Sequence, residues 1–201
     1  MQATFRALTD SLVPSTRRIG YESPINITDM GVHEYLIYGL DHYIAIQEQL
    51  HHITLPLAYP TAIMLDEAAT QLVNTGRAQA SPQIQFPGGG MFSRLSREDR
   101  IQTLSALENL AFDLYLLPSP FQNNGGLIKH VIDALNRFAM FGYYSEWPAY
   151  GTTRLYPPDD RRLEFFPWGW QQVGYPGVSL GYRDFRGMLI EYEEVKAKEV
   201  D

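Results

Sequence analysis

Three short motifs in this sequence have residue types and spacings that enzymes use in catalysis or cofactor binding. Gly177-Val-Ser-Leu-Gly181 matches the Gly-x-Ser-x-Gly pattern of a nucleophilic serine. Such a serine works on a turn between a strand and a helix, and its histidine follows later in the chain. Pro176 precedes the motif, no strong helical pattern follows it, and the last histidine is His130. We therefore expect a coincidence in a glycine-rich segment.

The second motif is Glu48-Gln-Leu-His51, which the helical pattern places near the end of an expected helix over residues 29–51. On a helix this spacing puts both side chains on one face, as in di-iron bundles. Such a site requires two Glu-x-x-His motifs and two further glutamates on facing helices. The sequence has no second Glu-x-x-His, and adding His42 does not complete a ligand set. We predict no metal site and keep a helical metal-dependent oxygenase using Glu48 and His51 as an alternative.

The third motif, Gly88-Gly-Gly90, lacks the spaced glycines of a dinucleotide-binding loop and the Lys-Ser/Thr of a P-loop.

His130 and Asp133 have helical spacing, but such pairs are usually solvated and contribute little to stability. We therefore predict no catalytic and no cofactor-binding residue in this chain.

Composition excludes several further classes. The 201 residues carry 16 basic and 23 acidic side chains, a formal charge of −7, which argues against a nucleic-acid surface. Without cysteine there is no disulfide and no thiolate chemistry. No apolar run is long enough to span a membrane. The N-terminus does not resemble a signal peptide and Arg17-Arg18 lacks an apolar stretch after it, so the expected location is the cytoplasm, or the periplasm if a leader was removed.

The elements that would position any site are mainly helical. Apolar residues at helical spacing, with Pro and Gly at the breaks, predict about five helices in an irregular bundle, over residues 3–13, 29–51, 60–74, 96–117 and 127–144. Ser96-Arg-Glu-Asp99 has the spacing of a helix N-terminal cap. Leu110 to Leu117 is apolar nearly all round, which predicts a buried second half for that helix. Residues 1–201 are expected to form one domain, with a helical core over 1–145 and an extended coil over 146–201.

The most unusual segment runs from Phe138 to Phe185. Its 48 residues hold 14 of the 26 aromatic residues, all three tryptophans, five prolines and six glycines. Pro and Gly disfavour a regular helix or a central strand, and disordered segments are poor in aromatics. We predict a long ordered coil wrapped around the helices. Because interfaces combine aromatic residues and arginine with a charged rim, we predict a partner interface at Tyr143, Tyr144, Trp147, Arg161, Arg162, Trp168, Trp170, Tyr175 and Pro176.

Four stretches together resemble the gluconate 2-dehydrogenase subunit 3 family, the small non-catalytic subunit of flavin-dependent sugar and alcohol dehydrogenases. They are Leu8–Pro14, Asp29–Tyr35, Leu95–Leu107, and Gly142-Tyr-Tyr-Ser with Pro148-Ala and Gly174-Tyr-Pro-Gly177. The last is the most specific. Many members of that family carry a twin-arginine leader, which this sequence lacks, and the stretch from Thr152 to Pro167 is longer than expected.

The resemblance implies a partner that is a flavin-dependent oxidoreductase of the glucose–methanol–choline type, which would hold the FAD. The small subunit would then stabilise that partner and assist its maturation, with no cofactor and no activity of its own. The resemblance leaves open whether the family's cytochrome partner applies. A further alternative is a helical protein that binds a small apolar or sugar ligand between Trp147, Trp168 and Trp170.

Overall fold

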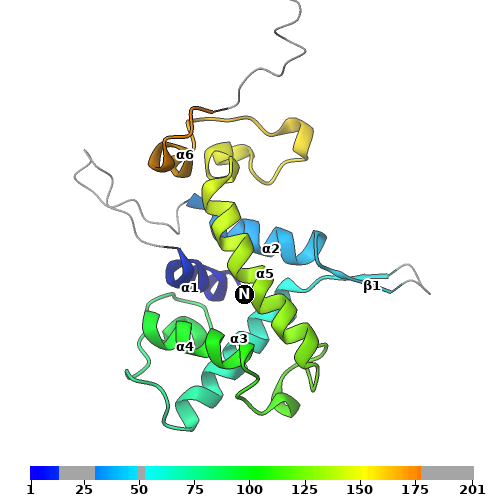
Figure 1. Ribbon diagram of the computed structural model, residues 1–201, viewed down its shortest axis with the longest axis vertical. Coiled ribbons are helices and arrows are strands. Elements are labelled where there is room, and N and C mark those ends of the chain that lie inside the picture. The colour runs from blue at the N-terminus through cyan, green and yellow to red at the C-terminus, as the bar shows by residue number, and fades with distance from the viewer. Residues whose placement is uncertain (14–29, 49–52, 178–201) are drawn as a thin grey trace, which may run out of the picture.

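The computed structural model describes residues 1–13, 30–48 and 53–177. In these ranges the protein is mainly helical, as predicted, with seven helical segments of six residues or more. The α-helices are α1 (Gln2–Leu12), α2 (Val32–His42), α3 (Ala58–Asn74), α4 (Arg97–Glu108), α5 (Gly125–Tyr144) and α6 (Trp168–Val173). The 3-10 helices are η2 (Phe92–Arg94), η3 (Leu114–Leu116), η4 (Trp147–Thr153) and η5 (Pro158–Asp160). Figure 1 shows α5 running between the other helices, with α6 at one end of the molecule.

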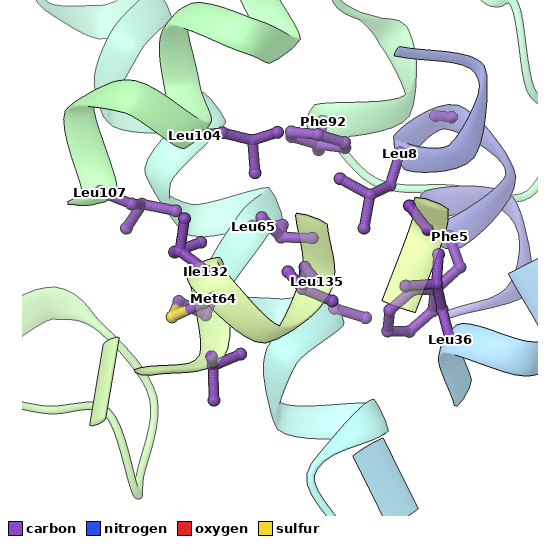
Figure 2. Close-up of a cluster of buried hydrophobic side chains, with 14 of the residues drawn as sticks. Phe5, Leu8, Leu36, Met64, Leu65, Phe92, Leu104, Leu107, Ile132 and Leu135 are labelled. Atoms are coloured by element: carbon purple, nitrogen blue, oxygen red, sulfur yellow. The ribbon is translucent and has the colours of Figure 1, made fainter. Parts of the chain in front are cut away.

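The helices α1 to α5 share one hydrophobic core, to which η2 also contributes. Side chains at helical spacing point into it from each element, since burial of these apolar stripes drives the packing. The core includes Phe5, Leu8, Leu36, Met64, Leu65, Phe92, Leu104, Leu107, Ile132 and Leu135 (Figure 2). The predicted helices over 3–13, 60–74 and 127–144 are therefore confirmed with only small shifts at their ends.

Helix α4 begins with the predicted cap. The Asp99 backbone N–H donates to Ser96 Oγ at 3.1 Å, and Ser96 Oγ donates to the Asp99 carboxylate at 2.9 Å. The same buried carboxylate accepts from the backbone N–H groups of Gln79 and Ala80, at 2.8 and 3.1 Å. The cap thus also holds the loop that follows α3.

Arg100 is fully buried on α4 and links it to α1. Its guanidinium donates to the Ala7 carbonyl at 2.9 Å, to Asp10 at 2.9 Å and to Ser11 Oγ at 3.1 Å. It also donates to the Leu95 carbonyl and to Gln85. A buried charge is costly without partners, and here every branch of the guanidinium has one.

Two predicted helices were too long. The pattern over 29–51 forms a helix only to His42, and the chain then enters an antiparallel hairpin of β1 (Ile46–Glu48) and β2 (Ile53–Leu55), which pairs Ile46 with Leu55. Asp41 Oδ1 accepts from the Ala58 N–H at 2.8 Å, so the end of α2 meets the start of α3 and the chain between them must reverse.

The prediction of a buried helical second half over Leu110–Leu117 is also wrong. Helix α4 ends at Glu108, Leu110 has a positive φ of 54°, and the short η3 follows. Tyr115 and Leu116 are exposed rather than buried. The side chain of Leu110 instead packs beside Gly125 at the start of α5.

The prediction of an extended coil over 146–201 needs correction, because residues 147–153 form η4 and residues 168–173 form α6. Residues 138–144 belong to α5, as the helix predicted over 127–144 requires. We call residues 145–177 the C-terminal lobe. The lobe lies at the end of α5 that also contacts α2 (Figure 1).

Candidate functional site

The C-terminal lobe stands on the crossing of α2 and α5, where glycines allow close approach. A Cβ at Gly39 would lie 2.9 Å from the Phe138 ring, and one at Gly142 would lie 2.9 Å from the Tyr35 ring. Each helix therefore supplies one aromatic ring and one glycine that leaves space for the ring of the other helix. The paired contacts bring the Tyr35 ring to 6.1 Å from both the Phe138 and Phe141 rings.

Trp147 joins the lobe to this crossing. Its Nε1–H donates to the Gly31 carbonyl at 2.8 Å, and its ring lies 5.2 Å from Tyr35 and 5.9 Å from Tyr38. The side chain is only 3% exposed. Trp147 was predicted to contact a partner, but in this structure its side chain packs inside the chain itself.

Arg161 holds the loop after η4 against the same rings. Its guanidinium lies 5.3 Å from the Tyr38 ring centre and 5.2 Å from that of Trp147, within cation–π range. Its Nε–H donates to the Tyr156 carbonyl at 2.9 Å. Arg162, also predicted at the interface, is exposed, and its backbone N–H donates to Thr153 Oγ1.

Helix α6 packs on the end of α5. Gly169 lies directly against the Tyr143 carbonyl, and the Tyr143 hydroxyl donates to Gln172 Oε1 at 2.8 Å. The Trp170 ring is 5.8 Å from Phe166 and 4.8 Å from Tyr175. Of the predicted interface residues here, Tyr143 and Trp170 are buried, Trp168 is half-buried, and Tyr144, Tyr175 and Pro176 are exposed.

Large apolar side chains on the outside of this region are the main feature. Nine of the eighteen exposed large hydrophobic residues of the described chain fall between residues 141 and 175. They are Phe141, Tyr144, Leu155, Tyr156, Leu163, Phe165, Phe166, Val173 and Tyr175. Sequence reasoning named only two of them, because it favoured tryptophans and their neighbours. The better signal was the apolar residues next to Pro157-Pro158 and Pro167, where no regular element can bury them.

A buried polar cluster lies beneath the lobe, at the start of α2. His33 is 2% exposed, and its Nε2 accepts from Arg6 Nε at 3.3 Å, so the ring is neutral. Burial first, then the charges of Arg6 and Arg154, lower the pKa of His33 to about 4. Arg154 in turn pairs with Glu34 at 3.3 Å, which ties the lobe to α2.

Two other groups near the lobe also have shifted pKa values. Burial, and then Tyr43, raise the pKa of the Tyr35 hydroxyl to about 12. The Glu164 carboxylate accepts from the Thr152 side chain and from its backbone N–H, and these bonds lower the pKa of Glu164. The hydrogen bonds of Glu164 connect the end of η4 with the chain that precedes α6.

The residues singled out for chemistry are not brought together. Glu48 lies on β1 rather than on a helix, so the spacing that suggested a di-iron ligand pair does not apply, and His51 lies outside the described residues. His42 is exposed, with its ring tilted against that of Tyr38 at 4.3 Å, while Asp133 pairs with Arg137 rather than with His130. Within residues 1–13, 30–48 and 53–177, no three acidic or histidine side chains are grouped to hold a metal ion. Ser179 of the Gly-x-Ser-x-Gly match also lies outside the described residues.

Comparisons of the chain with family models, with curated proteins and with solved structures gave no match. The family resemblance thus depends on the four sequence stretches alone. Among the described helices, none is both long and apolar enough to cross a bilayer.

Proposed function

We propose that this chain is a non-catalytic subunit that binds a flavin-dependent oxidoreductase of the glucose–methanol–choline type, stabilises it and assists its maturation. FAD and the reacting groups belong to that partner. The proposal joins the sequence resemblance to one structural observation, the exposed apolar surface of the C-terminal lobe.

That surface supports a protein partner for a physical reason. Monomeric proteins rarely leave large apolar side chains exposed together, because each costs free energy in water. Here the chain holds the loops of the lobe in place through Trp147, Arg161 and Glu164, while Leu155, Tyr156 and Val173 point outward with 54–65% exposure. A lobe that is fixed from within and apolar outside is suited to an interface, where burial of those residues would stabilise the complex.

The acidic and arginine side chains around these residues suit the rim of such an interface. Asp159, Asp160 and Arg162 are exposed beside Leu155 and Tyr156 in the sequence. Charged residues at a rim set orientation and association rate more than affinity. If the chain binds the folded partner and not the unfolded one, binding would stabilise the folded partner by mass action.

Co-expression with a candidate flavoprotein of the glucose–methanol–choline type tests the proposal. The expected result is more soluble flavoprotein and a higher FAD-to-protein absorbance ratio than without this chain. The double variant Leu155→Asp with Tyr156→Asp should lose that effect while the isolated chain keeps its thermal stability, because both side chains are exposed. Ile84→Asp is the matched control, since Ile84 is 77% exposed in the loop between α3 and η2.

The two parts of the proposal fail in different ways. A flavoprotein that is indifferent to the wild-type chain would refute the function as a whole. A flavoprotein that gains equally from wild type and from the double variant would keep the function but remove the lobe as its surface.

A further inference from the structure

Two buried hydrogen-bond donors at the start of α2 have no acceptor among the described residues. His33 Nε2 accepts from Arg6, and an imidazole with a pKa of about 4 carries no charge at neutral pH, so the ring proton lies on Nδ1. That Nδ1–H group is buried and unpartnered. The Nε–H group of Arg154, on the C-terminal lobe, is buried and unpartnered as well. Because buried polar groups are nearly always paired, these two donors indicate a site for an acceptor.

Arg154 lies directly over the N-terminus of α2. Its guanidinium packs against Gly31, where a Cβ would collide with it, and its Nη1 donates to Glu34 at 3.3 Å. Gly31 and Glu34 lie on either side of His33 in the chain, and the charge of Arg154 is close enough to lower the pKa of His33. The two unpartnered donors thus belong to one group of side chains. We call His33, Arg154 and Arg6 the α2 donor cluster.

The α2 donor cluster carries an excess of positive charge. Arg6 and Arg154 contribute two cations and the neutral His33 none, while among the described residues Glu34 is the carboxylate paired with the cluster. The positive end of the α2 dipole lies at the same point, because the N-cap residue Gly31 has no side chain to accept from the first N–H groups of the helix. A water molecule could accept from both donors, but only an anion would also balance the remaining charge.

One edge of the Arg154 guanidinium fits a carboxylate. A guanidinium presents its N–H groups as a planar fork, and a carboxylate accepts from two of them with its two oxygens. Nη1 is paired with Glu34, whereas Nε has no partner and Nη2 makes no hydrogen bond to a described residue. The edge formed by Nε and Nη2 is therefore available to a second carboxylate, and the Nδ1–H of His33 is a third donor in the same cluster.

We propose that the α2 donor cluster binds one carboxylate group, which accepts from the Nε–Nη2 edge of Arg154 and from the Nδ1–H of His33. The group belongs to a small monocarboxylic acid or to an acidic side chain of another protein, because both present the same two oxygens. Arg6 is exposed, so solvent reaches the edge of the cluster. The bound carboxylate would connect the lobe to α2. The proposal does not depend on the proposed function, since all its donors lie in this chain.

The first test measures the Tm of the full isolated chain at neutral pH while sodium formate replaces sodium chloride at constant ionic strength. A saturable rise in Tm is expected, because a ligand of the folded chain stabilises it by mass action. The few atoms of formate limit its Kd to roughly the millimolar range. Chloride cannot accept from the fork with two oxygens, so we expect it to bind at least about tenfold more weakly.

Correlation spectra of the imidazole nitrogens supply a readout that needs no variant. His33 should show the Nδ1–H tautomer, and its Nδ1 signal should move on addition of formate with the same Kd as in the Tm titration. The signals of His130, which is exposed on α5, should stay in place.

Arg154→Lys keeps the charge and removes the fork, and it should weaken formate binding at least about tenfold. Arg162→Lys is the matched control on an exposed side chain of the same lobe, and it should bind as wild type does. Acetate and the blocked peptide acetyl-Gly-Glu-Gly-amide distinguish the two sources of the carboxylate. Tighter binding of the peptide would assign the site to a protein side chain, and binding of acetate alone would assign it to a small acid.

Four outcomes would overturn the proposal. A Tm that does not change when formate replaces chloride would mean that the cluster has no preference for a carboxylate. An Nε2–H tautomer of His33, or an Nδ1 signal that formate does not move, would remove the imidazole from the site. Wild-type affinity in Arg154→Lys would remove the fork. If that variant does not fold, the spectra of the wild-type chain decide the question.

Discussion

The buried His33 predicts a loss of stability on mild acidification. The pKa of this imidazole is about 4 in the folded chain and 6.5 in an exposed histidine. Between these values the unfolded chain binds more protons than the folded one, so the free energy of unfolding must fall as the pH falls. The loss begins as the pH drops through about 6.5 and is complete below about 4. Each pKa unit corresponds to about 1.4 kcal/mol, which gives about 3 kcal/mol over the whole window and about 2 kcal/mol at pH 5.

The assay is urea unfolding followed by tryptophan fluorescence at about pH 7.5 and pH 5, in wild type and in His33→Gln. Glutamine keeps an acceptor for Arg6 but does not titrate. Other groups, among them Asp66, whose pKa burial raises, titrate in both proteins and cancel in the difference. Wild type should therefore lose about 2 kcal/mol more than the variant between the two pH values.

His130→Gln on the exposed face of α5 is the matched control, and it is expected to follow wild type. Equal pH dependence in wild type and His33→Gln would refute the reasoning. It would mean that His33 accepts a proton in the folded chain as easily as in water, despite the neighbouring Arg6 and Arg154.

Three further substitutions test how the lobe and α4 are held. Gly142→Ala places a Cβ against the Tyr35 ring and should cost about 1–3 kcal/mol in urea unfolding, whereas no change would mean that α2 and α5 separate easily. Trp147→Phe removes the indole donor to the Gly31 carbonyl, which keeps the backbone N–H groups of Glu34 and Tyr35, and it leaves space beside the Tyr35 and Tyr38 rings. It should cost about 1–3 kcal/mol, and a wild-type Tm would contradict the packing of the lobe described above. Arg100→Met removes the buried guanidinium and its hydrogen bonds to the Ala7 and Leu95 carbonyls, while Asp10 is left partly exposed. It should lower stability by roughly 1–3 kcal/mol, and an unchanged urea midpoint would show that this link between α4 and α1 contributes little.

Local signals in the sequence predicted most helices correctly. The Ser96–Asp99 cap and the apolar stripes of α1, α3 and α5 are short-range patterns, and the fold agrees with them. They failed where a contact distant in sequence decided the outcome. The apolar pattern of α2 continues past His42 in the sequence. The helix nevertheless ends there, because Asp41 accepts a hydrogen bond from the Ala58 backbone N–H and the chain reverses. Periodicity alone carries no information about such a partner.

The sequence indicated which segment carries exposed apolar side chains, but not which of its residues face outward. The concentration of rings after Phe138 indicated where a surface would lie. Composition did not reveal that Trp147 and Trp170 would turn inward while Leu155 and Phe165 turned outward. A ring is buried where the packed helices leave space for it and offer a hydrogen-bond partner to its polar atom, as the Gly31 carbonyl does for Trp147. Both conditions depend on how the helices pack, which composition does not reveal.

The reciprocal ring-and-gap contacts between α2 and α5 also fix the register of the two helices. Sliding α2 by one residue would move the Phe138 ring off Gly39 and against a side chain, and the same shift would move Tyr35 off Gly142. Because two such contacts must be satisfied at once, only one alignment is allowed. The part of the chain on which the lobe packs is thus rigid, so binding of the proposed partner would cost less conformational entropy.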